Sequence, residues 1–511
     1  MRVLLATQDS YPYYADDAAS WCDTLVRGLG EAEFTILSVI GHPYVLPRYK
    51  LPRNVRSLVT VPLSGMQDPA EYGHHASLPE YVRRRWSLTT EDIERDYLPA
   101  CDQFLRGVLD PSYPPRALAM SLLELHLHLR YFDYELTQTH PLVRALFASV
   151  LRDEWRRARP LEAPPSAEAL AEAWRWFHRL MLPLAVEVEP VDVAHASNPA
   201  FCGLPCVMSK LLHHTPYVVT EQSAWLRDQY LTIGTLGVAP VAAWFLTRLT
   251  SALAVVNYEF ADQVSPVYGD QVRWQRWLGV ESARILPIPN GASPDVFYPG
   301  VHDEHERPTV VAVGALTPLR GQLDLIEAAA LVRRAVPNVH VRLVAPGESG
   351  YARRCRDLVR ALGLDEAVSF EPGTGDVAAA LRQAHVFALP GVSDACPTTL
   401  IQAMLSGAGI VATNVGGVAE AVGDSALLVP PRDPVAMAEA IVTLLQSPDS
   451  TRCLGQYARN RALEMFTDAR CVEAYRSTYE RLAPRGCAER RTASVESTNA
   501  SAAPPMAPTA A

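Results

Sequence analysis

The sequence predicts an α/β protein with two parallel-sheet domains, and three observations carry this prediction. A chain of 511 residues has room for two domains of ordinary size. Short apolar runs alternate with helical patterns near both ends of the chain, which is typical of a parallel sheet covered by helices. Residues 385–420 contain a buried strand, a polar loop, a helix and a second strand in close succession.

The chain opens on a strand, a helix and a second strand. Val3–Ala6 and Phe34–Ile40 are β-type runs, and Trp21–Leu29 has helical spacing. The first apolar run is short, carries one Arg and is followed at once by Gln8 and Asp9, which does not fit a signal peptide. We therefore expect a first strand and a cytoplasmic protein.

A helical insertion is predicted between about residues 51 and 187. In this region Trp, Arg, Leu and Glu recur at helical spacing, as in 117–137 and 168–182, and prolines fall mainly in the connections. His126 and His128 lie two apart. They therefore do not share a helix face, which argues against a metal-binding pair.

The first domain resumes with two short strands. Asp192–His195 is followed by Ala and Ser, and Tyr217–Thr220 runs into Glu221 and Gln222. The longest apolar stretch, 234–256, is interrupted by one Arg and several hydroxyl residues. This pattern predicts a buried or membrane-surface pair of helices rather than a membrane span.

Composition excludes some classes of protein. A net charge of -10 and a pI near 5.8 argue against a nucleic-acid binder, which would show a basic face. The nine cysteines are scattered and odd in number, which suits a reducing compartment better than a disulfide framework. Cys202 and Cys206 lack a second pair at metal-ligand spacing, so we interpret them as small buried residues.

The loop at 391–399 is a candidate site for an anion or a nucleotide. It follows a strand, and Asp394 and Pro397 form a helix-start signal before an apolar helix. Ligands of open parallel sheets bind outside the carboxyl ends of the strands, where helix N-termini offer free N–H groups.

This loop and its helix resemble the donor-binding loop of the retaining glycosyltransferase family 4. The family pattern is Glu, Gly, an aromatic residue, Pro, four residues and a second Glu, and the two acidic positions here hold Asp394 and Gln402. The segment 288–291, Ile-Pro-Asn-Gly, matches the family almost residue for residue. The resemblance implies the GT-B fold, in which two Rossmann-like domains face a cleft, here with the helical insertion in the first.

In this family, the loop after the first strand of the second domain carries an Arg and a Lys that hold the donor's diphosphate. Ala315 stands at the first position, so that cation is lost. Arg320 stands at the second position, where it keeps the positive charge of the Lys and adds a guanidinium that can make two parallel hydrogen bonds. The donor-binding residues implied by the resemblance are Gly314, Arg320, Cys396, Pro397, Thr398, Thr399 and Gln402.

On the first-domain side, the sequence is similar to the Pel-polysaccharide-type branch of the family, in which Tyr-Pro-Tyr precedes a Gly-Gly pair and Ser-Trp. Tyr11–Tyr13 and Ser20–Trp21 match, but Asp16 and Asp17 replace the glycines, and two carboxylates would repel a diphosphate. Where the family has Glu-His-Gly, residues 221–223 are Glu-Gln-Ser, so Gln222 replaces the His. The neutral amide of Gln222 cannot shuttle a proton. The resulting catalytic candidates are Glu221, Gln222 and Asp394, and the acceptor-side candidates are Tyr13, Asp16, Asp17 and His195.

The resemblance also sets the expected domain boundaries. We expect a first, acceptor-side domain over 1–300, a nucleotide-sugar-binding domain over 301–465 with its hinge at 300–308, and a terminal helix over 466–484 that returns to the first domain. The tail, 485–511, is rich in Ala, Ser, Thr and Pro and is predicted to be disordered.

Two functions remain open. The first is a retaining hexosyltransferase that uses a nucleotide sugar, such as a UDP-sugar, and a polysaccharide or glycoconjugate acceptor, with no cofactor and no metal because no Asp-x-Asp motif ends a strand. The second is a catalytically degenerate scaffold or regulator of a glycan-synthesis complex, supported by the accumulated substitutions. Transferase ranks first because Arg320, Asp394, Pro397 and the Asn-Gly turn persist. Either function is compatible with peripheral association with a membrane-bound complex.

Overall fold

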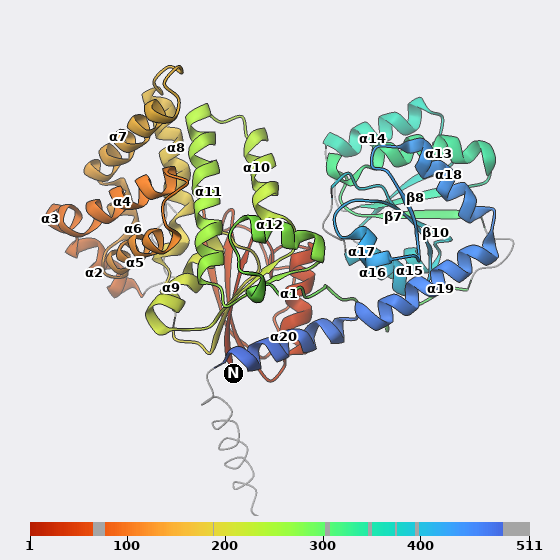
Figure 1. Ribbon diagram of the computed structural model, residues 1–511, viewed down its shortest axis with the longest axis horizontal. Helices are drawn as coiled ribbons and strands as arrows, with labels where there is room; N and C mark the ends of the chain where they lie inside the picture. Colours follow the sequence, from red (N-terminus) through yellow and green to blue (C-terminus); the bar gives the residue numbers. More distant parts are fainter. Residues whose placement is uncertain are drawn as a thin grey trace, which may run out of the picture.

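The computed structural model describes residues 1–64, 77–187, 189–301, 307–345, 350–373, 376–393 and 398–483. Figure 1 shows two α/β domains side by side, joined below by a long pair of helices. Each domain contains one six-stranded parallel sheet. The predicted fold class is therefore confirmed. The predicted tail and the centre of the predicted hinge, 302–306, lie outside the described residues.

The first sheet has the strand order β3-β2-β1-β4-β5-β6. Its strands are β1 Arg2–Gln8, β2 Glu33–Ile40, β3 Val55–Pro62, β4 Val193–Ala196, β5 Tyr217–Glu221 and β6 Gln263–Pro266. The helices between these strands, outside the insertion, are α1 Asp17–Gly28, α9 Leu204–His213, α10 Trp225–Thr235 and α11 Pro240–Phe260. The order reverses after β3, because the chain returns to the far side of β1 to form β4.

One boundary of the predicted insertion is wrong. Residues 55–62 form β3, an edge strand that pairs in parallel with β2, so the helices begin only at Leu78. The inserted elements are α2 Leu78–Ser87, α3 Thr90–Asp92, the π-helical turn η2 Ile93–Tyr97, α4 Leu98–Leu109, α5 Pro115–Tyr131, α6 Tyr134–Thr139, α7 Pro141–Ala158, α8 Ala167–Leu180 and η3 Leu182–Ala185. Their apolar faces share one core with the sheet, in which Phe104 and Phe147 belong to the same buried cluster as Val39. The insertion is thus part of the first domain.

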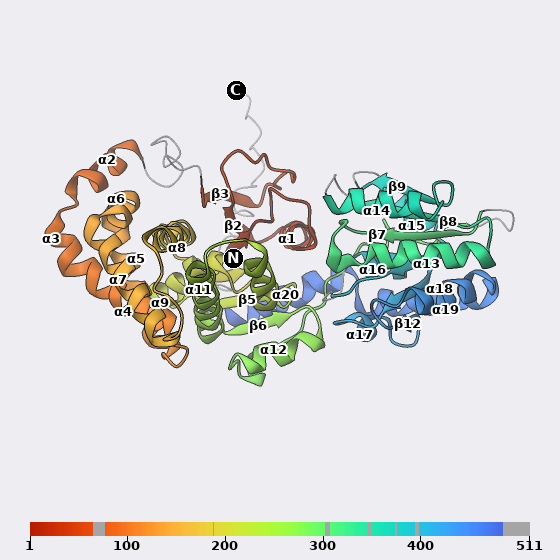
Figure 2. The same cartoon turned by 90° about the horizontal axis from the view of Figure 1, so that it is seen from above.

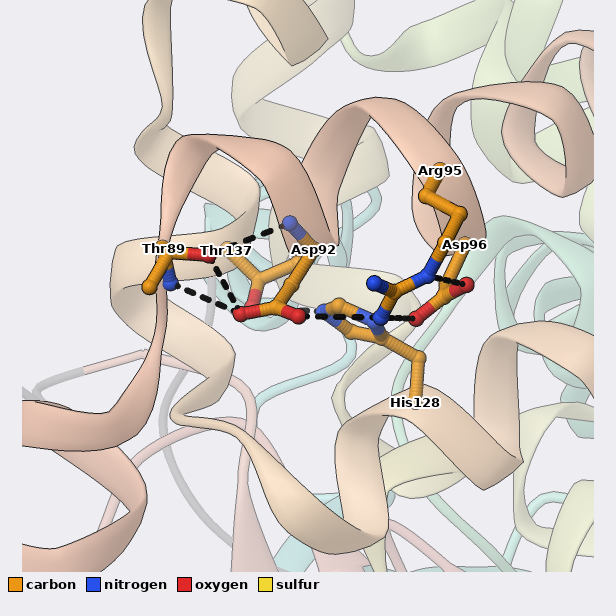
Figure 3. A network of polar contacts seen from close by, with 6 residues as sticks. All are labelled: Thr89, Asp92, Arg95, Asp96, His128 and Thr137. Atoms are coloured by element: carbon orange, nitrogen blue, oxygen red, sulfur yellow. Dashed lines mark hydrogen bonds and ion pairs between the residues drawn. The ribbon is translucent and has the colours of Figure 1, made fainter.

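Figure 3 shows a polar network at the π-helical turn of the insertion. Thr89 and Asp92 form a reciprocal capping box, and Arg95 bridges Asp92 at 3.0 Å and Asp96 at 2.7 Å. His128 packs behind the turn, with its ring centroid 5.0 Å from that of Tyr97. Because desolvation disfavours the imidazolium, burial lowers the pKa of His128 to about 4. The capping box and Arg95 thus stabilise α3 and η2, and the ring contact between Tyr97 and His128 joins η2 to α5.

Within the described residues, α11 is the one helix long and apolar enough to cross a membrane by length and composition. Of its most apolar window, 61% is buried in the structure. The helix packs against α8, α5 and α10, as Figure 1 also shows for α8 and α10. The apolar residues of α11 are therefore explained by its place in the core of the first domain.

The second sheet has the order β12-β11-β10-β7-β8-β9. Its strands are β7 Thr309–Val313, β8 His340–Ala345, β9 Val368–Pro372, β10 Val386–Leu389, β11 Gly409–Thr413 and β12 Leu427–Val429. Its helices are α13 Gln322–Ala335, α14 Gly350–Ala361, α15 Val377–Arg382, α16 Thr398–Leu405, α17 Val418–Val422 and α18 Pro434–Leu445. Two buried clusters involve alternate faces of the same strands, for example Phe387 in one and Val386 in the other.

Two C-terminal helices tie the domains together (Figures 1 and 2). The sequence did not predict α19, Pro448–Met465, which packs on α16 and β11. Its successor α20, Asp468–Leu482, packs on α1 in the first domain. At the junction the backbone of Ala292 pairs with that of Phe466 and Asp468. A Cβ on Gly291 would lie 2.3 Å from the Thr467 carbonyl carbon, which explains the glycine of the Asn-Gly turn.

Candidate functional site between the two sheets

The carboxyl ends of the two sheets meet at two contacts. Asp17, at the start of α1 after β1, lies with Oδ2 3.8 Å from Nη2 of Arg320, which follows β7. The backbone N–H of Gly269, after β6, donates to Oε2 of Glu420 in α17 at 2.9 Å. Ligands of open parallel sheets bind at this edge. The contacts therefore mark the region where the predicted site should lie.

The loop after β7 is built to hold Arg320 in place. Gly321 has a φ of 67°, and a Cβ there would lie 1.9 Å from the carbonyl oxygen of Pro390. Only glycine fits this close approach. The carbonyl of Leu319 accepts from the N–H of Val392 at 2.8 Å, which joins this loop to the loop after β10. Together they form a pocket whose lining includes Gly314, Arg320, Gln322, Leu389 and Pro390.

The pocket also contains a residue that the sequence did not single out. Gln322 is 5% exposed, and its Nε2 donates to the carbonyl of Ala315 at 2.9 Å. Its Oε1 is buried and has no hydrogen-bond partner within the described ranges. The sequence could have indicated Gln322, because it is a polar residue at the first position of α13, directly after Gly321. Gln322 leaves one acceptor for a ligand.

The helix α16 brings a second set of polar groups to the same edge. Thr398 and Thr399 form its first turn, and Gln402 lies one turn further on and is half-buried. The Oγ1 of Thr399 is buried without a hydrogen-bond partner in the part of the chain that the structure describes. Free N–H groups of a first helical turn attract anions. The predicted site residues Asp394, Cys396 and Pro397 lie outside the described residues.

The two aspartates that replace the expected glycine pair have different roles. Asp16 caps α1, because its Oδ1 accepts from the N–H of Ala19 at 2.6 Å and from Oγ of Ser10 at 2.8 Å. Asp17 instead reaches the second domain, where its Oδ2 lies 3.8 Å from Nη2 of Arg320. Burial raises the pKa of Asp17, while Arg320 and Thr398 act in the opposite direction.

Glu221 does not face this region, which corrects its prediction as a catalytic residue. Its side chain is 2% exposed and accepts hydrogen bonds from Nε2 of Gln275 at 2.6 Å, the hydroxyl of Tyr258 at 2.9 Å and the N–H of Trp225 at 3.1 Å. Burial raises the pKa of Glu221 to about 6, against the effect of the Gln275 and Tyr258 hydrogen bonds. Glu221 therefore fixes the end of β5 and presents almost no surface to a substrate.

The predictions for His195 and Tyr13 as acceptor-side residues are also wrong. His195 has no exposed surface, and its two ring nitrogens are 2.6 Å from the Tyr479 hydroxyl and 2.8 Å from Oγ1 of Thr220. Tyr13 is buried, with its hydroxyl 2.6 Å from Oγ1 of Thr60 in β3. Both ring nitrogens of His195 are thus used, and the Tyr13 side chain is only 7% exposed, so neither is presented to an acceptor.

Gln222 remains a candidate because its hydrogen bonding is incomplete. Its Oε1 accepts from Nδ2 of Asn290 at 2.6 Å. Nε2 of Gln222 and Oδ1 of Asn290 are both buried without a partner among the described residues. Either orientation of the two amides leaves one donor and one acceptor, which suits a sugar hydroxyl. Across the described residues, no group of three His, Cys, Asp or Glu side chains is arranged to hold a metal ion.

Two known families match the chain, one in each domain. Residues 1–283, more than half of the sequence, match a family described as "Domain of unknown function (DUF3492)". The chain belongs to this family. Residues 307–447, which contain Arg320 and α16, match "Glycosyl transferases group 1".

Curated relatives include proteins named as glycosyltransferases. A D-inositol 3-phosphate glycosyltransferase of Corynebacterium urealyticum is 31% identical over 38% of this chain and 51% of its own length. An alpha-maltose-1-phosphate synthase of Mycolicibacterium smegmatis is 28% identical over 58% of this chain and 80% of its own length. The chain thus spans about half the length of several curated relatives that it matches.

Solved structures share the fold. Sucrose-phosphate synthase from Thermosynechococcus elongatus aligns with a TM-score of 0.59 at 16% identity over 94% of this chain and 98% of the other. The HepE protein of Anabaena, in complex with UDP, aligns with a TM-score of 0.57 at 14% identity over 94% and 100%. The two-domain fold of the chain is thus the GT-B fold, and residues 307–447 match a glycosyltransferase family.

Proposed function

We propose that the protein is a retaining glycosyltransferase that moves a hexose from a nucleotide sugar to a polysaccharide or glycoconjugate acceptor. One observation carries the proposal: Arg320 lines a pocket where β7 and β10 end, and Arg320 and Thr398, the first residue of α16, both lower the pKa of the same carboxyl group, that of Asp17. A cation beside a helix N-terminus suits a diphosphate. A UDP-sugar is the proposed donor, and the HepE structures described with UDP and UDP-glucose support this choice.

The described side chains have separate proposed roles. Arg320 balances the negative charge that the diphosphate gains as it leaves the sugar. Gln322 and Thr399 offer their unpartnered oxygens to hydroxyl or N–H groups of the nucleotide sugar, and Gln402 hydrogen-bonds the ribose. Gln222 contacts the transferred sugar through its amide. No cofactor and no metal enter this proposal.

The alternative is a catalytically degenerate scaffold or regulator of a glycan-synthesis complex. A specific observation favours it, since Asp17 contacts the very guanidinium that should hold the donor. The side chains of Glu221 and His195 are also committed to buried networks. Membership of the Pel-type branch, a cytoplasmic location and peripheral association with a membrane-bound complex remain proposals under either function.

Titration calorimetry with UDP-, GDP- and ADP-sugars discriminates between the two functions. We expect weak but measurable binding of a UDP-sugar, and slow donor hydrolysis or transfer, because Arg320 and α16 still offer positive potential to a phosphate. The absence of binding by any of these donors up to millimolar concentrations would reject the transferase and leave the scaffold.

A further inference from the structure

Asp17 of the first domain lies beside Arg320 of the second domain, the residue that we propose holds the diphosphate. Its Oδ2 lies 3.8 Å from Nη2 of Arg320. Arg320 and Thr398, the first residue of α16, both act to lower the pKa of the Asp17 carboxyl group. Asp16 fixes the start of α1, because its Oδ1 accepts hydrogen bonds from the N–H of Ala19 and from Oγ of Ser10. Asp17 is the first residue of that helix, so its backbone is fixed as well. Asp17 is therefore held in place by its own helix and by the opposite domain.

A carboxylate at this point has the features of a bound phosphate. It is anionic, it lies beside a guanidinium, and a residue at a helix N-terminus also favours its charged form. Arg320 is also the residue proposed to hold the diphosphate of the donor. Two anions cannot share this cation without the repulsion that like charges experience at short range.

We propose that Asp17 is a built-in competitor of the donor's diphosphate, so that donor binding exchanges one anion for another on Arg320. The inference rests on the proposed function for the identity of the ligand. Release of Asp17 would open only the contact at α1. The Gly269–Glu420 hydrogen bond and the helices α19 and α20 would still join the domains.

Binding of inorganic pyrophosphate and of UDP is the first test, measured by calorimetry. Asp17→Asn keeps the side-chain shape and removes the charge, and should tighten binding of both ligands roughly three- to tenfold. Asp23→Asn is the matched control, because Asp23 carries the same charge on α1 and pairs with Arg27 on the helix surface. It should change both affinities less than twofold. An Asp17→Asn affinity equal to that of the wild type would overturn the proposal.

A double-mutant cycle separates competition from general repulsion. If Asp17 acts by occupying Arg320, the gain from Asp17→Asn should shrink to less than twofold in an Arg320→Ala background. An equal gain in both backgrounds would mean that Asp17 only adds negative potential, and the proposal would be rejected.

Hydrogen exchange without ligand tests the contact independently of donor binding. Amides of 314–321 and 398–402 should exchange faster in Asp17→Asn than in wild type, with no change in Asp23→Asn. Faster exchange without any pyrophosphate or UDP binding would keep the interdomain contact and reject both the proposed function and the competitor role. Unchanged exchange would reject the contact itself.

Discussion

The second-domain side of the site leaves polar atoms for a ligand, whereas two residues at strand ends of the first domain, His195 and Glu221, use theirs internally. Gln322 and Thr399 each keep an oxygen without a partner among the described residues. Both ring nitrogens of His195 and both carboxylate oxygens of Glu221 are already hydrogen-bonded. We infer that the second domain supplies the contacts to the diphosphate and nucleotide of the donor, while His195 and Glu221 stabilise the fold of the first domain and Gln222 is left for the sugar. The predictions below test this division.

The largest expected effect is acid destabilisation through buried histidines. Burial lowers the pKa of His195 to about 3 and that of His128 to about 4, below the ordinary value of about 6.5. Between these values and pH 6.5 the unfolded chain binds more protons than the folded one, so stability falls as the pH decreases. Each group contributes a slope of up to about 1.4 kcal/mol per pH unit.

Urea denaturation at several pH values measures this slope. His195→Gln should reduce the slope between pH 6.5 and 4 by about one proton, and His128→Gln should act in the same direction. Glu221, whose folded pKa is raised to about 6, opposes the trend between its ordinary value and pH 6. An unchanged slope in both variants would show that neither histidine is held neutral by burial.

The next effect concerns Glu221. Glu221→Ala should lower the free energy of unfolding by about 3 kcal/mol, because the donors on Tyr258, Gln275 and Trp225 lose their partner in the core. Glu221→Gln should cost clearly less, since Gln275 can turn its unpartnered Oε1 toward the new amide. Equilibrium denaturation checks both values. Wild-type stability with lost donor binding in Glu221→Ala would instead return Glu221 to the site.

The opposite result is expected for Arg320. Arg320→Ala should weaken nucleotide-diphosphate binding about tenfold or more, because a charge-assisted contact contributes about 1.5–3 kcal/mol. Its stability should stay close to that of the wild type, since the side chain is partly exposed. Arg353→Ala on the exposed face of α14 is the control for loss of one positive charge. Equal affinities in the two variants would remove Arg320 from the site.

The sequence predicted the strands of the second domain well and the orientation of side chains poorly. A strand such as Gly409–Thr413 is a local apolar pattern, and the structure gives the same bounds. The burial of His195 depends on Tyr479, which lies 284 residues away in sequence, and that of Glu221 depends on Tyr258 and Gln275. Local spacing carries no information on such partners. Edge strand β3 was missed because it is only partly buried and lacks a continuous apolar run.

The smallest expected effect concerns Gln402, where the family pattern has a Glu. Gln402 lies one turn after Thr398 on α16 and is half-buried, so its amide can hydrogen-bond a ribose hydroxyl without a charge. Under the transferase proposal, Gln402→Glu should leave turnover similar or raise it modestly, by about threefold at most. Steady-state kinetics with the UDP-sugar that binds best measures the change. Gln402→Leu is the control, because it keeps the volume and removes the hydrogen bond, and it should raise KM. If Gln402→Leu bound the donor as tightly as the wild type, Gln402 would belong to the scaffold of α16, and the donor contacts of the second domain would be confined to the loops and the first turn of that helix.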